Sequence, residues 1–315
     1  MIENANYDYD YDCVVAFYKF HKYLNRGIRN IFNQTLKPKN IIFVNDGDLS
    51  LKKKDVEIIF QNSEINLIYI DLKKNLGAVG ATKIGINYVK SKYFRTSALD
   101  DIMHKQLAEK SINLIKQYPD SGMVFSDPGF FLDNRSKDVN IKLKLSNDLI
   151  YFDRLETRKI LLQRNFKPHS PTIFFNTKKF MISNLFDKKY GYMADLLTNW
   201  KIMIEYGCNY IPENLAYSTI HEDQWSKKQS NKYDIKFHEF ILDDLKLNHQ
   251  FFYKKLYQLN LYYDFPLRFV IKLKKQHNKF IKFKIIIRTI KYNIWNFAKE
   301  RISLSILSYF YKKFS

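Results

Sequence analysis

The stretch IIFVNDGD, residues 41–48, decides the fold class of this chain. Its first four residues form a short apolar, β-branched run of the kind expected for a buried parallel strand, and its last four form a polar turn that holds Asp46 and Asp48. A similar apolar run occupies residues 13–18, and apolar residues at helical spacing lie between the two runs, up to the turn around Pro38. Strand, helix and strand in this order predict a parallel crossover unit.

The alternation of strand-like and helix-like segments continues along the chain. Residues 134–170 are polar and mixed in pattern, and we expect them to be a variable insertion that crosses the sheet. The sequence therefore predicts an α/β fold with a Rossmann-like, mostly parallel central sheet flanked by helices. Further strands are expected at residues 65–70, 93–99, 123–125 and 172–175, and helices at residues 78–89, 105–118 and 199–206, the last ending at Gly207.

Composition and charge exclude several classes of protein. A chain of 315 residues that is 46% apolar can fill a sizeable core, and its 9 Gly and 7 Pro exclude collagen-like and low-complexity architectures. Its 52 Lys and Arg against 32 Asp and Glu give a net charge of +20, which predicts an anionic partner: nucleic acid, a phosphorylated substrate or a membrane surface. Residues 266–315 alone carry thirteen basic residues and one Glu.

The basic C-terminal segment also has an apolar stripe, with residues recurring at intervals of three and four. Such a stripe beside many basic residues predicts an amphipathic helix that lies on an anionic membrane surface, although a helix packed against the rest of the chain is the other interpretation. We expect two domains, residues 1–235 and a helical, basic region of residues 236–315. No nucleic-acid-binding motif accompanies the charge, so nucleic acid is not expected as a partner. The stripe consists of Phe280, Phe283, Ile287, Ile290, Ile294 and Phe297.

The sequence also predicts where the protein resides. Cys13 and Cys208 show no pairing pattern and are expected to be buried free thiols in a reducing compartment. Residues 1–11 lack the features of a secretory signal, and no run approaches the ~18 uninterrupted apolar residues of a membrane-spanning helix. With the basic tail, this predicts a cytoplasmic protein that is peripheral on the inner face of the cytoplasmic membrane.

Acidic residues follow three of the expected strands. Ligands of open α/β sheets bind beyond the carboxyl ends of the strands, so these acids predict a ligand site. The adjacent pair Asp100 and Asp101 suits Mg²⁺ or Mn²⁺ carried by a nucleotide diphosphate, because both ions prefer hard oxygen ligands. Motifs for zinc binding, for a serine nucleophile elbow and for a phosphate-binding P-loop are missing from the sequence. The three acidic groups are Asp46 with Asp48, Asp100 with Asp101, and Asp127.

Several segments, in order, resemble the family 2 glycosyltransferases of the GT-A fold. The matches span residues 14–226. They are Val14–Tyr18 with Lys22-Tyr23-Leu24 and the "NQT" turn Asn33-Gln34-Thr35, Asn45-Asp46-Gly47-Asp48 for "DDGS", Asn75-Leu76-Gly77 through Ile84-Gly85 for "NxGxxxARNxG", Ser97–Asp101 for the acidic motif, and Asp195 with Trp200 and Gly207 for the helix that bears the catalytic base.

The resemblance implies roles in donor binding. Ala16, Tyr18, Asp46, Lys83 and Asp100 are expected to contact a nucleotide sugar, with Asp46 accepting a base N–H of a uridine-type nucleotide and Asp100 near the ribose.

It also implies roles in chemistry. Asp101 would bind a divalent cation, Mn²⁺ or Mg²⁺, that bridges the diphosphate, and His221 is a further candidate ligand. Asp195 would be the base that deprotonates an acceptor hydroxyl. The implied activity is metal-dependent, inverting transfer of a sugar from a UDP-sugar to a saccharide or lipid-linked acceptor in surface polysaccharide or glycan assembly.

Other interpretations remain open at the level of sequence. Asp46 can shape a turn, Asp195 can be an acid at a helix start, and His221 can be a packing residue. The chain also departs from the family pattern at Ala16-Phe17, Asn45, Ala98 and Thr82, where Lys83 would supply the missing positive charge. A non-catalytic basic binding protein, either a decayed transferase scaffold or a nucleic-acid-binding module, is therefore the alternative function.

Overall fold

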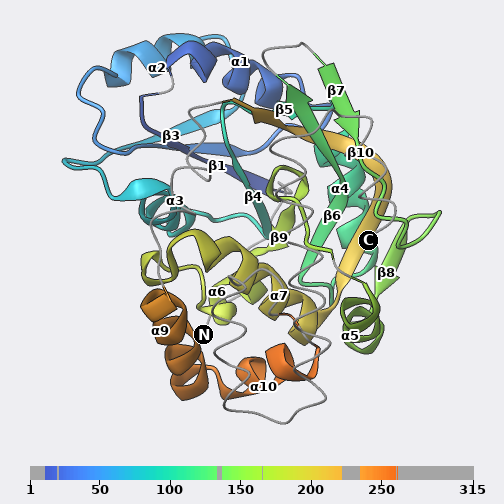
Figure 1. Ribbon diagram of the computed structural model, residues 1–315. Coiled ribbons are helices and arrows are strands. Elements are labelled where there is room, and N and C mark those ends of the chain that lie inside the picture. The colour runs from blue at the N-terminus through green and yellow to red at the C-terminus, as the bar shows by residue number, and fades with distance from the viewer. Residues whose placement is uncertain are drawn as a thin grey trace. The chain divides into compact units, whose positions relative to one another are not determined.

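The computed structural model describes residues 11–19, 21–132, 137–164, 166–221, 235–259 and 261 (Figure 1). The described parts of Met1–Asp153 and Pro168–His221 form one compact unit, and those of Arg154–Lys167 and Glu222–Ser315 form a second. The domain boundary expected after residue 235 stays a prediction. The apolar stripe expected from Phe280 to Phe297 lies outside the described residues.

The described residues of the first unit form a 10-stranded sheet in the order β3-β2-β1-β4-β9-β6-β10-β5, with β7 paired to β6 and β8 to β10. The long ladders β3–β2, β2–β1, β1–β4 and β6–β10 are parallel, and the antiparallel ladders are short. This confirms the predicted α/β fold with a mostly parallel sheet. The strands are β1 (Tyr11–Phe17), β2 (Asn40–Asn45), β3 (Asn66–Asp71), β4 (Tyr93–Ser97), β5 (Ile102–Met103), β6 (Met123–Leu132), β7 (Lys137–Asn140), β8 (Ile150–Phe152), β9 (Phe174–Asn176) and β10 (Cys208–Ile220).

Helices connect these strands. In the described residues no helix is long and apolar enough to cross a membrane. The first unit holds α1 (His21–Phe32), α2 (Lys53–Phe60), α3 (Gly77–Ile86), α4 (Leu107–Gln117), α6 (Thr177–Ser183), α7 (Ala194–Tyr206) and the 3₁₀ segments η2 (Ser170–Thr172) and η3 (Lys188–Met193). The second unit holds α5 (Arg154–Gln163), α9 (Ile235–Asn248) and α10 (Gln250–Gln258).

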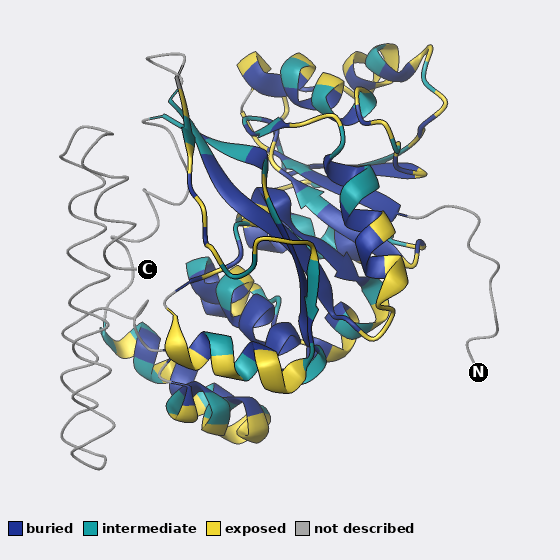
Figure 2. Ribbon diagram, turned by 90° about the vertical axis from the view of Figure 1, so that its right-hand side faces the viewer, coloured by how far each residue is buried: buried dark blue, intermediate teal, exposed yellow. Residues whose placement is uncertain are grey.

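The strands at the centre of the first unit are covered on both faces, and most of their residues are buried (Figure 2). On one face of β1, Cys13 and Val15 join a core with the apolar residues of α1, α2 and α4. On the other face Val14 lies against α3, where a Cβ atom added to Gly85 would come within 2.5 Å of Val14 Cγ1. Both cysteines are buried free thiols, as predicted.

The sequence prediction did not include strands β5 and β10, and two further parts of the sheet differ from it. The strand expected at residues 123–125 continues to Leu132, so Asp127 lies inside β6 and not beyond its end. The carboxylate of this buried residue accepts hydrogen bonds from Tyr210 Oη at 2.6 Å and from the backbone N–H of Leu143 at 2.9 Å. Asp127 thus holds structure together, and its expected place in the ligand site was wrong.

The segment expected to be an insertion, residues 134–170, contributes β7, β8 and α5. The two strands are short and are held by backbone pairing to β6 and β10, so they need no alternation of apolar and polar side chains. The polar β7 and the apolar β8 therefore joined the sheet without the usual alternating pattern.

We expect Gly27→Ala to destabilise the protein by about 1–3 kcal/mol, because overpacking at a site with no room forces the backbone to shift. A Cβ atom at Gly27, in the middle of α1, would lie 2.5 Å from Leu99 Cα and 2.6 Å from Leu99 O. Urea unfolding measures the change. Asn25→Ala, at an exposed position of the same helix, is the control and should change stability by less than about 0.5 kcal/mol. Equal stability of the Gly27 variant and the wild type would contradict this packing.

Candidate functional site

The site residues gather at the carboxyl ends of three neighbouring strands. Because β2, β1 and β4 are parallel and adjacent, Asp46 after β2, Tyr18 after β1 and Asp100 after β4 all lie at one edge of the sheet. Ala16 is paired with Val44 of β2 near this edge. The sheet order therefore brings together most of the residues expected to contact a nucleotide sugar.

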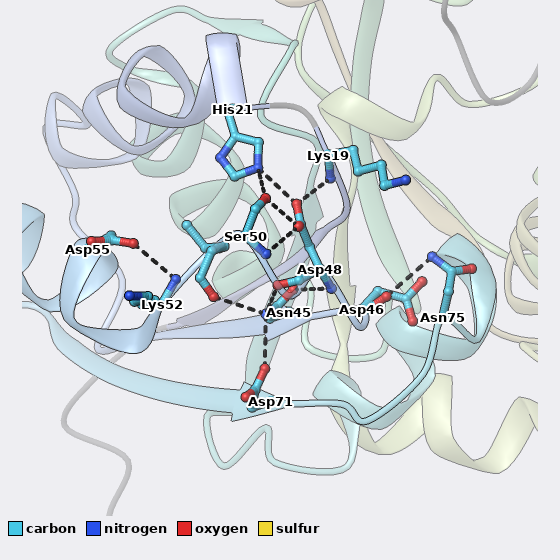
Figure 3. Close-up of polar contacts among 11 residues, drawn as sticks. Lys19, His21, Asn45, Asp46, Asp48, Ser50, Lys52, Asp55, Asp71 and Asn75 are labelled. Carbon is cyan, nitrogen blue, oxygen red and sulfur yellow. Dashed lines mark hydrogen bonds and ion pairs between the residues drawn. The ribbon is translucent and has the colours of Figure 1, made fainter.

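Asp46 holds the loop that leads into the N-terminus of helix α3. Its carboxylate accepts a hydrogen bond from the backbone N–H of Leu76 at 2.6 Å. Its backbone carbonyl accepts one from Asn75 Nδ2 at 3.2 Å (Figure 3). Burial raises the pKa of Asp46, although the backbone N–H donors oppose this. The neighbouring Gly47 has φ 77°, and a Cβ atom there would lie 2.6 Å from the backbone carbon of Lys74. The turn after β2 and the loop before α3 are thus packed against each other.

A second cluster joins the loops that follow β1 and β2. The Asp48 carboxylate meets His21 Nε2 at 2.9 Å, Ser50 Oγ at 2.6 Å and the backbone N–H of Lys19 at 3.1 Å (Figure 3). Although burial alone would raise it, these hydrogen bonds hold the pKa of Asp48 below its ordinary value. Asn45, which replaces the first acid of the family motif, donates to Asp71 Oδ1 at 2.9 Å. The cluster fixes the shape of the loops that follow β1 and β2.

Helix α1 holds the backbone of the acidic loop, residues 98–104, from one side. Arg26 Nη2 donates to the carbonyl of Asp100 at 2.6 Å, and Asn30 Nδ2 donates to the carbonyl of Asp101 at 3.0 Å. One turn further along, Gln34 Nε2 donates to the carbonyl of His104 at 3.1 Å. Arg26 and Asn30 are four residues apart and so share one face of α1, and Gln34 follows two residues after the helix ends.

Strand β10 and the residue that follows it contact the same acidic loop, including the carboxylates of Asp100 and Asp101. The Thr219 hydroxyl donates to the carbonyl of Asp100, and the Ser218 hydroxyl and Thr219 N–H donate to the carboxylate of Asp101. His221, just beyond the strand, lies with its Nε2 at 3.0 Å from Asp100 Oδ2. The structure therefore brings His221 to the acidic pair, and its hydrogen-bonded partner there is Asp100.

The electrostatics of the acidic pair favour a cation. Burial, followed by the neighbouring charge of Asp100, raises the pKa of Asp101 well above its ordinary value, while Arg95 opposes the shift. Carboxylate and imidazole ligands fit Mn²⁺ in kind. In the described part of the chain no group of three or more His, Cys, Asp or Glu side chains is arranged to hold a metal ion. A cation at Asp101 would therefore need further ligands from the bound substrate, and the metal ligands stay a prediction.

Asp195 lies in the first turn of α7. It is solvent-exposed as a residue, yet its carboxyl has enough protein around it that desolvation raises its pKa to about 6. A carboxyl in contact with water and with a pKa near neutrality suits a base that must meet an acceptor. Within the described residues Asp195 makes no hydrogen bond or ion pair with the acidic pair.

Lys83, expected at the donor, forms an ion pair with Asp187, which is half-buried. Asp187 also accepts a hydrogen bond from the backbone N–H of Lys189 at 3.0 Å and so caps η3, the segment that leads directly into α7. Lys83 therefore connects α3 to the segment before Asp195. Its contact with a donor stays a prediction.

The sequence analysis missed four residues that shape the site: Arg26, Asn30, Ser218 and Thr219. Arg26 and Asn30 carried a signal, because these two polar residues, four positions apart, stand beside the apolar residues of the same helix. Ser218 and Thr219 carried none, since their contacts reach residues more than a hundred positions away.

Comparison with known families identifies the class of protein. The model of glycosyl transferase family 2 matches residues 12–188, more than half of the chain. The chain belongs to this family and is a glycosyltransferase.

Curated relatives agree with this assignment. The chain is 26% identical over 221 residues to an uncharacterized glycosyltransferase of Haemophilus influenzae, covering 68% of this chain and 66% of that protein. It is 25% identical over 162 residues to the minor teichoic acid biosynthesis protein GgaB of Bacillus subtilis, covering 51% of this chain but 18% of that protein. The matches thus span less than two thirds of the lengths of these relatives.

Solved structures share the fold. The crystal structure of S. aureus TarS 1-349 in complex with UDP-GlcNAc has a TM-score of 0.58 and 13% sequence identity, and the match covers 94% of this chain and 77% of that one. The structure of TarS 1-349 in complex with UDP has a TM-score of 0.55 at 12% identity, with 92% of each chain covered. These are GT-A glycosyltransferases, which confirms the predicted fold.

Proposed function

We propose that the protein transfers a sugar from a UDP-sugar to a hydroxyl group of a cell-surface polymer or its lipid-linked precursor, with inversion at the anomeric carbon and with help from Mn²⁺ or Mg²⁺. The observation that carries the proposal is the division of acids in the first unit. Asp46, Asp100 and Asp101 lie at the carboxyl edge of the sheet, whereas Asp195 lies in the first turn of α7 and has a pKa raised to about 6. A transferase needs both a site for the diphosphate and a base for the acceptor.

On the donor side, the nucleotide would bind over the ends of β1 and β2, near Tyr18 and Asp46. The uridine-type base is supported by the carboxylate of Asp46 and by the UDP in the TarS structures that share this fold. The diphosphate would lie at Asp100 and Asp101, with Asp101 and His221 as the protein ligands of the cation. When bound, the cation would neutralise negative charge that develops on the departing diphosphate.

On the acceptor side, Asp195 would take the proton of the attacking hydroxyl. The hydroxyl oxygen forms the new bond to the anomeric carbon while the bond from that carbon to the UDP oxygen breaks, and the carboxylate holds the released proton. Inversion follows when attack comes from the face opposite the leaving group. Tying α3 to η3, the Lys83–Asp187 pair would help to fix the distance between the donor and this base.

The acceptor is proposed to be a teichoic-acid-like polymer. Two relatives carry names from that chemistry: GgaB, and the teichoic acid poly(glycerol phosphate) polymerase of Staphylococcus epidermidis, which is 30% identical over 88 residues, covering 28% of this chain and 12% of that protein. The net charge of +20 suits a polymer that carries phosphate groups. Poly(glycerol phosphate) is therefore the first acceptor to test.

We expect Asp195→Asn to retain UDP binding but to reduce sugar transfer by roughly 10²-fold or more, because a general base acts in the transition state and not in the binding of the nucleotide. UDP release from UDP-GlcNAc with poly(glycerol phosphate), and calorimetry with UDP, measure the two effects. Glu205→Gln, the same acid-to-amide change at the other end of α7, is the matched control and should leave transfer unchanged.

The same residue predicts a pH dependence. Because the pKa of Asp195 is raised to about 6, the carboxyl is protonated at lower pH and cannot accept a proton. We expect kcat/KM to rise with pH up to about 6 and then to level off, and this limb to be missing from the residual activity of Asp195→Asn. Turnover near the wild-type value in that variant, or an equal loss of UDP affinity, would show that Asp195 is structural.

Asp101→Asn should abolish the Mn²⁺-dependent part of UDP binding, because it removes a buried carboxylate whose charge is disfavoured unless a cation is present. Calorimetry with UDP, with Mn²⁺ and then with EDTA, isolates that part. Asp120→Asn, in the turn between α4 and β6, is a control of the same chemical type and should leave the affinity unchanged. Undiminished metal-dependent affinity in a folded Asp101 variant would rule out this site.

The basic tail is proposed to bind an anionic membrane surface on the cytoplasmic side. Removal of residues 268–315 should leave a folded protein that binds UDP but no longer sediments with anionic vesicles, and salt should weaken the binding of the full chain because exposed charges are screened. Vesicles of neutral lipid are the control. Binding that survives truncation would contradict the anchor, and unfolding on truncation would mean that the apolar stripe packs inward.

A further inference from the structure

His169 lies within reach of the acidic pair through one intermediate residue. Its Nε2 is 3.0 Å from Ser218 Oγ. In the β10–β5 ladder Tyr217 pairs with Ile102, so Ser218 and Asp101 are the next residues on the two strands, and hydrogen bonding from the Ser218 side chain lowers the pKa of Asp101. The three groups therefore form a chain of hydrogen bonds from an imidazole, through a hydroxyl, to a carboxylate. Neither the family motifs nor the roles assigned above use His169.

The direction of these hydrogen bonds follows from the number of protons. A serine hydroxyl has one proton, and beside a cation, where Asp101 is ionised, Ser218 can give that proton only to the carboxylate. Its contact with His169 must then be one in which the hydroxyl oxygen accepts, so His169 Nε2 carries a proton and donates it. The imidazole thereby sets the rotation of the hydroxyl, which would otherwise be free to turn toward other acceptors.

The surroundings of His169 keep the ring in place. Its backbone carbonyl accepts hydrogen bonds from the N–H of Thr172 at 2.9 Å and from Thr172 Oγ1 at 2.8 Å, and Thr172 is fully buried. The ring of Phe130, on β6, lies against the imidazole with 5.0 Å between ring centroids. A side chain anchored at its backbone and on one face of its ring loses little further entropy when it orients a neighbour.

We propose that His169 is a positioning residue for Asp101, which it orients through the hydroxyl of Ser218 toward the cation and diphosphate of the donor. This inference rests on the proposed function, because it assumes that Asp101 meets a metal-bound donor. Groups that orient metal ligands from behind commonly change metal affinity when they are removed. His169 itself touches neither the donor nor the reacting atoms in this proposal.

The test uses the full chain and measures UDP affinity by calorimetry with and without Mn²⁺. We expect His169→Leu and Ser218→Ala each to weaken the Mn²⁺-dependent affinity by roughly 10-fold and to leave the metal-free affinity unchanged. His169→Gln, whose amide N–H can replace Nε2–H, should restore the affinity to within about 3-fold of wild type. His249→Leu, in the second unit, is the control for the same substitution elsewhere.

A double variant separates action through Ser218 from a general structural effect. His169→Leu combined with Ser218→Ala should bind no more weakly than Ser218→Ala alone, because the imidazole has nothing left to orient. The inference about His169 would be overturned if the losses of affinity multiply in the double variant. It would also be overturned if a folded His169→Leu protein keeps its affinity while Asp101→Asn loses it. Neither result would affect the proposed function. If Asp101→Asn also leaves the metal-dependent affinity unchanged, the proposed cation site fails and the role of His169 fails with it.

Discussion

Two hydrogen bonds from helix α1 to backbone carbonyls, from Arg26 to Asp100 and from Asn30 to Asp101, are the constraint on which the site depends. Two adjacent carboxylates repel each other and lose hydration when they are buried, so a loop that carries them would turn them toward water if it were free. With its carbonyl oxygens held by α1, the loop presents its carboxylates to β10, where Ser218 and Thr219 donate to Asp101. The side chains of the acids are thus placed by bonds made to their backbone.

Fixed positive charge lies close to the same loop. Arg95, on β4, is almost completely buried, donates to the carbonyl of Pro171 at 2.8 Å and stands 5.3 Å from the ring centroid of Phe174. In the described part of the chain it forms no ion pair, and its charge lowers the pKa of Asp101 against the stronger effect of burial. A buried guanidinium cannot lose its proton, so the field at Asp101 has a permanent positive component. The acidic pair is therefore less unfavourable than its burial alone would make it.

The strands in the first half of the fold could be predicted from the sequence because their burial gives a simple pattern. Strands such as β1 and β2 are buried on both faces and read as continuous apolar runs, and their parallel order places Asp46 and Asp100 at one edge. The second half follows no such pattern. In β10 polar residues interrupt the apolar pattern, and its partner β6 holds a buried acid, Asp127. Only the first residues of β6 were therefore predicted as a strand, and β10 was not predicted at all.

The same contrast applies to the site. Two acids next to each other in sequence, such as Asp100 and Asp101, can be recognised from the sequence as a candidate site. The groups that hold them in place come from distant parts of the chain. Arg26 and Thr219 are 193 residues apart and yet donate to one carbonyl, that of Asp100. Contacts of this kind depend on tertiary structure, and a single sequence carries no local pattern for them.

The pairing of β10 with β6 shifts register between Ile211 and Asn214 and again between Asn214 and Ala216. Successive residues of a strand point to opposite faces, so these irregularities decide which face Ser218 and Thr219 occupy. One residue gained or lost between the shifts and Ser218 would exchange the two faces, turning the hydroxyl of Ser218 away from Asp101 while leaving the backbone pairing possible. This short part of β10 therefore tolerates substitutions far better than insertions or deletions. Descendants of this chain could vary the residue types there but not the length of the segment.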